Sequence, residues 1–330
     1  MVEPWVIRHI IHRYWCQVCK KIVEARVTDA LPKSTIGLRT VVYSAWLHYV
    51  LGISFDKIIE LLNTSARFGV STGGLFGAWH NLAQVLKPLY KHIGKGARWS
   101  AVLNADETGW RVNGRTHWLW CFASKDLVYY VIERSRGAPV VLKVLGKYFA
   151  GILITDFLAS YNQIRALAKQ KCLVHLLREI IRVNLFDFSS EWKDFRRSLK
   201  RLVLDGLRLG RERGKIDSES FERKKILLNE RLVQLYAKSY SNENAQRLRK
   251  RLERHRNEIL TFLDYPEVTA DNNHAERQMR PPAQCRKMSG GNRSNRGAKA
   301  QAMLMSIFRT LQMRGYDPVP TLLFMVREHL

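Results

Sequence analysis

Three acidic residues in this chain occupy positions that suit metal-dependent chemistry. Asp106 ends the apolar run SAVLNAD, Asp156 ends the apolar run AGILITD, and Glu276 lies far downstream in DNNHAER. Hard cations such as Mg²⁺ and Mn²⁺ take oxygen ligands, and a pair of such ions can clamp both the attacking and the leaving oxygen of an in-line displacement at phosphorus. The three carboxylates therefore predict a two-metal site that acts on phosphodiesters.

Each carboxylate also has a purely structural interpretation. Asp106 could be a turn residue, Asp156 could cap a helix that begins at FLASYN, and Glu276 could be a capping glutamate that follows an asparagine. Glu107 is the main rival of its neighbour for the metal-binding role. Adjacent residues of an extended chain point to opposite faces, so we expect only one of this pair to face the metals.

A strong basic charge indicates the class of substrate. The 330 residues include 55 Lys and Arg against 29 Asp and Glu, which gives a formal net charge of +26 and a pI of about 10.2. Such an excess predicts a polyanionic partner. DNA is favoured, and no membrane partner is expected, because no lipid-anchor signal or bilayer-spanning apolar run accompanies the charge.

The densest basic segment follows Glu276 directly. Residues 277–299 contain seven Lys or Arg and no Asp or Glu, and the word RKMSGGNRSNRGAKA is predicted to be a loop. Basic side chains of this kind position a nucleic-acid backbone without reading its sequence. The predicted phosphate contacts are Arg277, Arg280, Arg286, Lys287, Arg293, Arg296 and Lys299. A solvated cationic face is the alternative for this segment.

Short runs rich in β-branched and aromatic residues must position the first two acids. The predicted strands within residues 99–175 are VLNAD, THWLWCFAS, LVYYVIE, GILITD and KCLVH, with a helix at RGAPVVLKVLG and another after Asp156. This order predicts an α/β fold with a mixed sheet and helices on its faces. The acids reach one point only if Asp106 and Asp156 end neighbouring strands and the helix of Glu276 packs beside them. A ribonuclease-H-like fold provides this arrangement.

Helix formers dominate most of the remaining chain. Residues 176–263 lack strand signals and are predicted to be a helical insertion within a catalytic domain that spans residues 99–330. Residues 37–96 are predicted to be helical, and FDKIIELLN, GVSTGG and LFGAWHNLAQVLKPLYKHI follow one another like a helix-turn-helix DNA-binding region. Helices that only pack on one another would give the same pattern.

Residues 1–35 form a basic, aromatic segment that is similar to part of a zinc finger. Cys16 and Cys19 make a C-x-x-C pair, which is half of a structural zinc site, because such sites usually take four ligands. His9 or His12 could supply further ligands. The five cysteines of the chain are odd in number and scattered, which favours a reducing cytoplasm over a disulfide framework.

The words around the three acids resemble those of the insertion-sequence-66 family, a group of DDE-type bacterial transposases. The matching words are ADETGWRVNGRTHWLW, ITDFLASYN, KCLVHLLRE and DNNHAERQMRPPAQCRKMSGGNRSNRGA, and the resemblance covers roughly residues 10–325. It implies that Asp106, Asp156 and Glu276 are a catalytic triad that binds two Mg²⁺ or Mn²⁺ ions. It also implies that the chain cuts transposon ends and joins their 3′ ends to target DNA.

The resemblance has further implications outside the triad. His175 would be a neighbour of the active site, and a buried structural histidine is the alternative. Asn273 is a further candidate neighbour, because it lies three positions before Glu276. A second cysteine pair lies upstream in the resembling family, and this chain begins too late to contain it, so Zn²⁺ at Cys16 and Cys19 would need other ligands. The expected partners are double-stranded DNA, both transposon ends and target, further copies of the chain on DNA, and helper proteins of the same element. The expected location is the bacterial cytoplasm, in association with the nucleoid.

Two other functions fit the same residues. A ribonuclease-H-like nuclease would cut DNA without joining it, and the triad alone does not separate such an enzyme from a transposase. A catalytically inert, transposon-derived protein would keep the DNA-binding surface and lose the chemistry. An assay for joining of a 3′ end to target DNA distinguishes a transposase from a nuclease. A test for cleavage in Mg²⁺ or Mn²⁺ distinguishes either enzyme from an inert DNA-binding protein.

Overall fold

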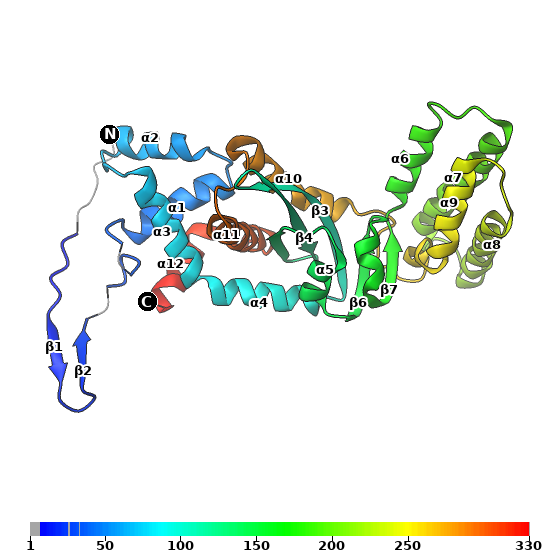
Figure 1. The fold of residues 1–330 in the computed structure, drawn as a ribbon. Helices are drawn as coiled ribbons and strands as arrows, with labels where there is room; N and C mark the ends of the chain where they lie inside the picture. Colours follow the sequence, from blue (N-terminus) through cyan, green and yellow to red (C-terminus); the bar gives the residue numbers. More distant parts are fainter. Residues whose placement is uncertain (1–6, 26, 33, 330) are drawn as a thin grey trace.

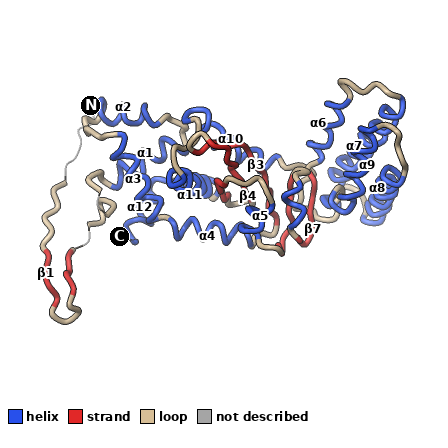
Figure 2. Tube along the Cα trace, viewed as in Figure 1, coloured by secondary structure: helices blue, strands red, loops and turns tan. Residues whose placement is uncertain are grey.

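The computed structural model describes residues 7–25, 27–32 and 34–329. The molecule is elongated, with a β-hairpin at one end, a helix-covered sheet in the middle and a helical unit at the other end (Figure 1). The described strands lie in the hairpin and the central sheet (Figure 2). No helix within the described ranges is long and apolar enough to cross a membrane. The predicted α/β class is confirmed.

Five strands form the central sheet in the order β5-β4-β3-β6-β7. Their bounds are β3 (Val102–Val112), β4 (Arg115–Ala123), β5 (Val128–Glu133), β6 (Tyr148–Thr155) and β7 (Arg165–Lys171). The first three are antiparallel neighbours, whereas β6 is parallel to β3 and β7 is parallel to β6. The predicted mixed sheet is therefore present, and its longest strand, β3, lies at the centre.

A two-residue turn fixes the register of the long β3–β4 hairpin. Asn113 and Gly114 connect the strands with φ angles of 49° and 69°. Two left-handed residues match the twist of the flanking strands, and Asn-Gly is the pair that adopts this turn most readily. The register that follows pairs Asp106 of β3 with Cys121 of β4.

The expected strand at KCLVH lies earlier in the chain. Of this word only Lys171 belongs to β7, Cys172 is the N-cap of α6 (Leu173–Val183), and the rest is helical. The buried apolar residues of α6 recur at helical spacing, which a five-residue word is too short to reveal. The helix expected between β6 and β7 is present as a five-residue 3₁₀ helix, η1 (Ala159–Gln163).

The basic word RKMSGGNRSNRGAKA is mostly helical, contrary to the expected loop. Its first residues continue α10 (Asn273–Ser289) and its last residues begin α11 (Asn295–Met313). Gly290 ends α10 with a left-handed φ of 68°. The Ser294 hydroxyl then caps α11 by accepting a hydrogen bond from the Gly297 amide at 3.0 Å. Strong end signals on both sides thus confine the loop to residues 290–294.

The N-terminal helices share an apolar core with the sheet. They are α1 (Leu38–Tyr49), α2 (Phe55–Ser65), α3 (Thr72–Val85) and α4 (Lys87–Arg98). One continuous cluster of buried side chains joins them to the sheet, to α5 (Ala138–Leu145), to α11 and to α12 (Pro318–His329). Phe55 of α2 stacks on Phe76 of α3 with 3.9 Å between the ring centroids. The helix pair with the predicted helix-turn-helix outline is therefore packed against the body of the protein.

A second apolar core fills the helical unit at the far end of the molecule. This unit contains α6, α7 (Ser190–Glu212), α8 (Ser218–Ala237), α9 (Glu243–Arg254), η2 (Arg256–Glu258) and η3 (Thr261–Leu263). Its last segment returns to the edge strand β7. The Gln170 side chain donates a hydrogen bond to the Ile259 carbonyl at 3.1 Å and accepts one from the Phe262 amide at 2.8 Å. The unit is thereby fixed to the sheet at both of its ends.

The N-terminal hairpin consists of β1 (Arg13–Cys16) and β2 (Lys21–Glu24). It extends away from the rest of the molecule in Figure 1. Side chains such as Trp15, Val18 and Ile22 are largely exposed there. The hairpin therefore has local strand pairing and little support from the core.

Candidate active site

The sheet places Asp106 and Asp156 at the same level. Asn104 of β3 pairs with Ile154 of the parallel strand β6. Asp106 lies two residues after Asn104, and Asp156 lies two residues after Ile154. Because side chains alternate between the two faces of a sheet, a step of two residues returns to the same face. The carboxylate of Asp156 accepts a hydrogen bond from the Leu158 amide at 2.9 Å, which fixes the turn after β6. Strand pairing thus brings two acids together that are fifty positions apart in the chain.

Electrostatics indicate that all three predicted acids share one space. Burial, the largest cause, and the nearby carboxylates of Glu107, Asp156 and Glu276 together raise the pKa of Asp106 to about 7, against a lowering effect of the hydrogen bond from the Glu107 amide. That amide donates a hydrogen bond to Oδ1 of Asp106 at 2.9 Å. Like charges crowded at a half-buried site repel one another, and a divalent cation bound between them would relieve this repulsion.

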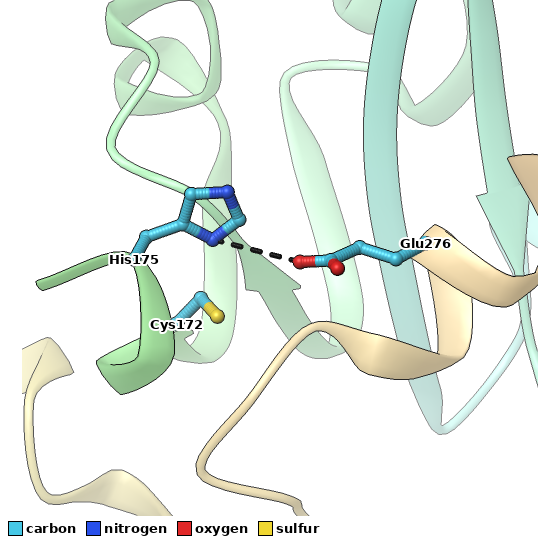
Figure 3. Close-up of side chains that lie close together, drawn as sticks. All are labelled: Cys172, His175 and Glu276. Carbon is cyan, nitrogen blue, oxygen red and sulfur yellow. Dashed lines mark ion pairs between the residues drawn. The ribbon is translucent and has the colours of Figure 1, made fainter. Parts of the chain in front are cut away.

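Glu276 reaches the site from the first turn of α10, and Figure 3 shows its side chain pointing toward His175 of α6. The Nδ1 atom of His175 lies 3.8 Å from Oε1 of Glu276, and Nη1 of Arg178 lies 3.6 Å from the same oxygen. Within the described part of the chain, neither His175 Nδ1 nor Glu276 Oε1 has a hydrogen-bond partner. Both atoms are therefore available to a ligand of the site.

Cys172 adds a third potential ligand atom on the α6 side. The ligand atoms of Cys172, His175 and Glu276 lie within 4.8 Å of one another (Figure 3). Burial raises the pKa of the Cys172 thiol, although backbone hydrogen bonds from His175, Asn272 and Val174 act in the opposite direction. A neutral thiol is a poor ligand for hard cations, so the carboxylates are the better match for Mg²⁺.

Asn272 fastens the start of α10 to the sheet. Its carboxamide accepts a hydrogen bond from the Asn104 side chain at 3.0 Å and donates one to the Ala105 carbonyl at 2.9 Å. Its backbone amide donates to the Cys172 sulfur at 3.2 Å. Asn272 is fully buried. The helix of Glu276 is thus bound to β3 immediately before Asp106, a contact that the sequence words alone did not indicate.

The predicted neighbour Asn273 has a different place. It is the first residue of α10, half-buried, and its backbone amide donates a hydrogen bond to the Asp271 carboxylate at 2.9 Å. The structure therefore assigns the bridging position between helix and sheet to Asn272, and places Asn273 beside it at the entrance of the helix.

Glu107 has protein partners of its own. Its side chain is 1% exposed, pairs with the Arg136 guanidinium at 2.8 Å and accepts a hydrogen bond from the Tyr161 hydroxyl at 2.8 Å. Burial raises the pKa of this carboxyl and Asp156 adds to the rise, whereas Arg136 and Tyr161 lower it. Glu107 thus has a cationic partner, whereas no ion pair of Asp106 is present among the described residues, although the Asp156 carboxylate raises the pKa of both acids.

The seven predicted phosphate contacts fall into two groups. Six side chains are exposed on α10, on residues 290–294 or on the start of α11; these are Arg277, Arg280, Lys287, Arg293, Arg296 and Lys299. Arg286 differs, because its guanidinium donates to the Thr108 hydroxyl at 3.2 Å and to the Gly109 carbonyl of β3. Arg286 therefore also ties α10 to the sheet.

The short loop between α10 and α11 is docked on the β3–β4 turn. The Asn292 amide donates to the Arg111 carbonyl at 2.9 Å, and the Asn113 amide donates to the Asn292 carbonyl at 2.7 Å. A Cβ on Gly291 would lie 2.3 Å from the Arg111 carbonyl oxygen, so glycine is required there. The exposed basic side chains of this loop are consequently held near the sheet that carries Asp106.

Cys16 and Cys19 lie at the tip of the N-terminal hairpin. The Cys19 amide is 3.5 Å from the Cys16 sulfur, and backbone hydrogen bonding from Cys19 lowers the pKa of the Cys16 thiol. Both cysteines are free thiols. Among the described residues they are not joined by a third metal-ligating side chain. Among the described residues, the structure thus provides two of the four ligands that a structural zinc site usually takes, as the sequence did.

Comparison with known proteins identifies the family. A family model described as "Transposase IS66 family" matches residues 33–300. A curated relative, the uncharacterized protein y4qI of Sinorhizobium fredii, is 29% identical over 228 residues. That match covers 61% of this chain and 42% of the relative, so the chain spans less than half of the relative's length. The family match extends over the sheet, the helical unit and the helix of Glu276, and the chain belongs to the IS66 transposase family.

Proposed function

We propose that this chain is a metal-dependent DNA transposase of the DDE type, with Asp106, Asp156 and Glu276 as its catalytic triad. The family match supports the transposase activity. The observation that carries the choice of residues is the common level of Asp106 and Asp156 on β3 and β6, with the carboxylate of Glu276 close enough to raise the pKa of Asp106.

The order of the strands supports a ribonuclease-H-like catalytic domain over residues 99–330. Numbered from β3, the order β5-β4-β3-β6-β7 becomes 3-2-1-4-5, with three antiparallel strands followed by two parallel ones. This arrangement brings the first and fourth strands together, as the sequence-based account of the site requires. The helical unit then enters the chain after the fifth strand and before the helix of Glu276.

The donor set fits two Mg²⁺ or Mn²⁺ ions, which would supply activation of the attacking oxygen and stabilisation of the leaving oxygen. Asp106 and Asp156 would hold these ions from the sheet, and Glu276 from α10. Asn272 orients Glu276, while His175 and Arg178 lie where they could contact a phosphate oxygen.

The proposed reaction has two displacements at phosphorus. A water oxygen attacks the phosphodiester at the transposon end, and the 3′ oxygen leaves as a hydroxyl. That hydroxyl then attacks a target phosphodiester and displaces a 3′ oxygen of the target strand. Both steps exchange one P–O bond for another, so they need no covalent protein–DNA intermediate and no further co-reactant.

The basic surface and the N-terminal regions would serve the DNA. The exposed Lys and Arg of residues 277–299 would position the backbone near the triad. The helices of residues 37–96 would form a DNA-binding region, and Cys16 with Cys19 would join a zinc site completed by other ligands. Transposon ends, target DNA, further copies of the chain and helper proteins of the same element would be its partners.

A strand-transfer assay tests this function. The purified chain and its Asp156→Ala variant would be incubated with a labelled transposon-end duplex, a target plasmid and Mn²⁺ at low salt. Asp194→Ala is the matched control, because Asp194 is a largely exposed aspartate of the helical unit. We expect joined product from the unmutated chain and from Asp194→Ala, and none from Asp156→Ala.

The other outcomes identify the alternatives. Cleaved but unjoined DNA that depends on Asp156 would favour a nuclease. DNA binding without cleavage, equal in the unmutated chain and in Asp156→Ala, would contradict the proposed chemistry and favour an inert DNA-binding protein.

A further inference from the structure

A buried lysine lies directly beneath the turn that carries Asp156. Lys171, the last residue of β7, is 0% exposed. Its ammonium donates hydrogen bonds to the Thr155 hydroxyl and to the Asp156 carbonyl oxygen, both at 3.0 Å. A fully buried charge is costly unless partners compensate it, so the partners of this group indicate why it is there.

The compensating charge comes from the helical unit. Oε2 of Glu258, in η2, lies 3.8 Å from the Lys171 ammonium. The same oxygen is 2.8 Å from Nδ1 of His255. Glu258 therefore connects the end of the helical unit to the lysine that holds the backbone of Asp156.

A second contact of the helical unit with the same turn involves Phe157. The ring of Phe157, the residue after Asp156, meets the His255 ring edge to face at 5.6 Å between centroids. The Arg251 guanidinium lies 5.1 Å from the centre of the Phe157 ring. Arg251 is itself paired with Glu179 of α6, so the two ends of the helical unit meet at this ring.

We propose that Lys171 and Glu258 are positioning residues, through which the helical unit holds the Asp156 turn in the geometry that metal binding needs. Asp156 follows the last residue of its strand, so ladder hydrogen bonds no longer fix it. Metal sites need their ligands held to within about 0.5 Å, and residues behind the ligands supply this precision. A buried ion pair is rarely the most stabilising way to fill a core, which favours a role in geometry over one in stability.

This inference rests on the proposed function, and direct measurement of Mn²⁺ binding tests it. Mn²⁺ affinity would be measured for the full chain by electron paramagnetic resonance, with Asp156→Ala as the reference for loss of the site. We expect Lys171→Met to weaken Mn²⁺ binding by about tenfold or more, as is usual when groups behind a metal ligand are removed. Cleavage of the end duplex should then need more Mn²⁺ and recover at saturation, while the affinity for DNA stays unchanged.

Lys169→Met is the matched control. Lys169 lies two positions earlier on β7, donates to the Tyr161 and Asn162 carbonyls at 3.2 and 3.4 Å, and also lies 3.9 Å from Oε1 of Glu258. It therefore shares the charge partner of Lys171 but donates no hydrogen bond to Asp156 among the described residues. We expect its Mn²⁺ affinity and its Mn²⁺ requirement for cleavage to equal those of the unmutated chain. Equal weakening in both variants would overturn the assignment to Lys171.

A double variant separates position from stability. Lys171→Met takes a buried cation away from Glu258, which keeps Lys169 and His255 as partners, and this imbalance would destabilise the chain. Lys171→Met with Glu258→Gln removes both charges of the pair. We expect the double variant to keep the melting temperature of the unmutated chain and still to bind Mn²⁺ weakly. A folded double variant with unaltered Mn²⁺ affinity would overturn this proposal alone. Absence of Asp156-dependent Mn²⁺ binding in the unmutated chain would overturn the proposed function as well.

Discussion

Two groups of candidate metal ligands within the described part of the chain differ in how firmly the fold supports them. Asp106, Asp156 and Glu276 come from two paired strands and a helix that Asn272 bonds to the sheet. Cys16 and Cys19 come from a single exposed hairpin. A prearranged site lets a metal bind without ordering the chain first, whereas the hairpin would gain its order from the metal and from ligands elsewhere.

Loss of a triad carboxylate should have the largest effect. We expect Asp106→Ala or Glu276→Ala to lower Mn²⁺-dependent cleavage at least about a thousandfold, because metal stabilisation of the transition state contributes several kcal/mol. The paired replacement of Cys16 and Cys19 by serine should leave the rate constant of cleavage unchanged when DNA is saturating. Single-turnover cleavage of the end duplex measures both. Equal losses in the two sets would remove the distinction between the regions.

Removal of the Asn272 side chain should have the next largest effect. Asn272→Ala takes away the link between α10 and β3 and leaves the Asn104 amide and the Ala105 carbonyl without that partner. We expect a destabilisation of about 1–3 kcal/mol and cleavage reduced about 10–100-fold. Denaturant unfolding and single-turnover cleavage are the measurements. Asn229→Ala, on an exposed position of α8, is the control and should change neither.

The crowded carboxylates predict a dependence of stability on pH in the absence of metal. The pKa of Asp106 rises from 3.8 to about 7 on folding, so the folded chain binds more protons between these values and loses stability as the pH rises through this window. Asp106→Asn should therefore melt about 2 °C or more above the unmutated chain at pH 8, and the difference should vanish near pH 4.

Divalent metal should reverse that difference. Mg²⁺ binds the folded chain through the ionised carboxylates, so it should raise the melting temperature of the unmutated chain at pH 8 and leave Asp106→Asn little changed. A melting temperature of the unmutated chain that is insensitive to both pH and Mg²⁺ would contradict the crowding of the three acids.

Thiol reactivity should distinguish the two regions without any substitution in the chain, and it has the smallest expected effect. Cys16 and Cys19 are half-buried and exposed, whereas Cys121, Cys172 and Cys285 are buried. Burial also raises the pKa of the last three thiols, which lowers their nucleophilicity. We expect two cysteines to react with a disulfide reagent at once and three only after unfolding. Rapid reaction of Cys172 would mean that the α6 side of the site is open.

Local sequence patterns were sufficient for the parts of the fold that depend on short runs. The strands that lead to Asp106 and Asp156 are apolar and bounded by turn residues, and the helix of Glu276 begins within an asparagine pair, with Asn272 as its N-cap. Five-residue words were insufficient at KCLVH, because the helical spacing of α6 becomes visible only over a longer window. The basic word before α11 was misjudged because its glycines outweighed the helix-forming residues on either side.

Contacts between distant residues could not be predicted from one sequence. Asn272 and Ala105 are separated by 167 positions, and only the packing of α10 on β3 brings them together. Lys171 and Glu258 likewise meet because the helical unit returns to β7. No local pattern marks a buried lysine next to Asp156, since an isolated Lys in QKCL reads as an exposed residue.

Crystals soaked in Mn²⁺ would test the central claim most directly. Anomalous scattering locates the ions without any assumption about activity. We expect the ions to be bound by Asp106, Asp156 and Glu276. In Asp156→Ala crystals, the ions that Asp156 binds should be absent. Ions that leave Asp106 and Asp156 unoccupied, or that bind only at Cys172 and His175, would contradict this claim.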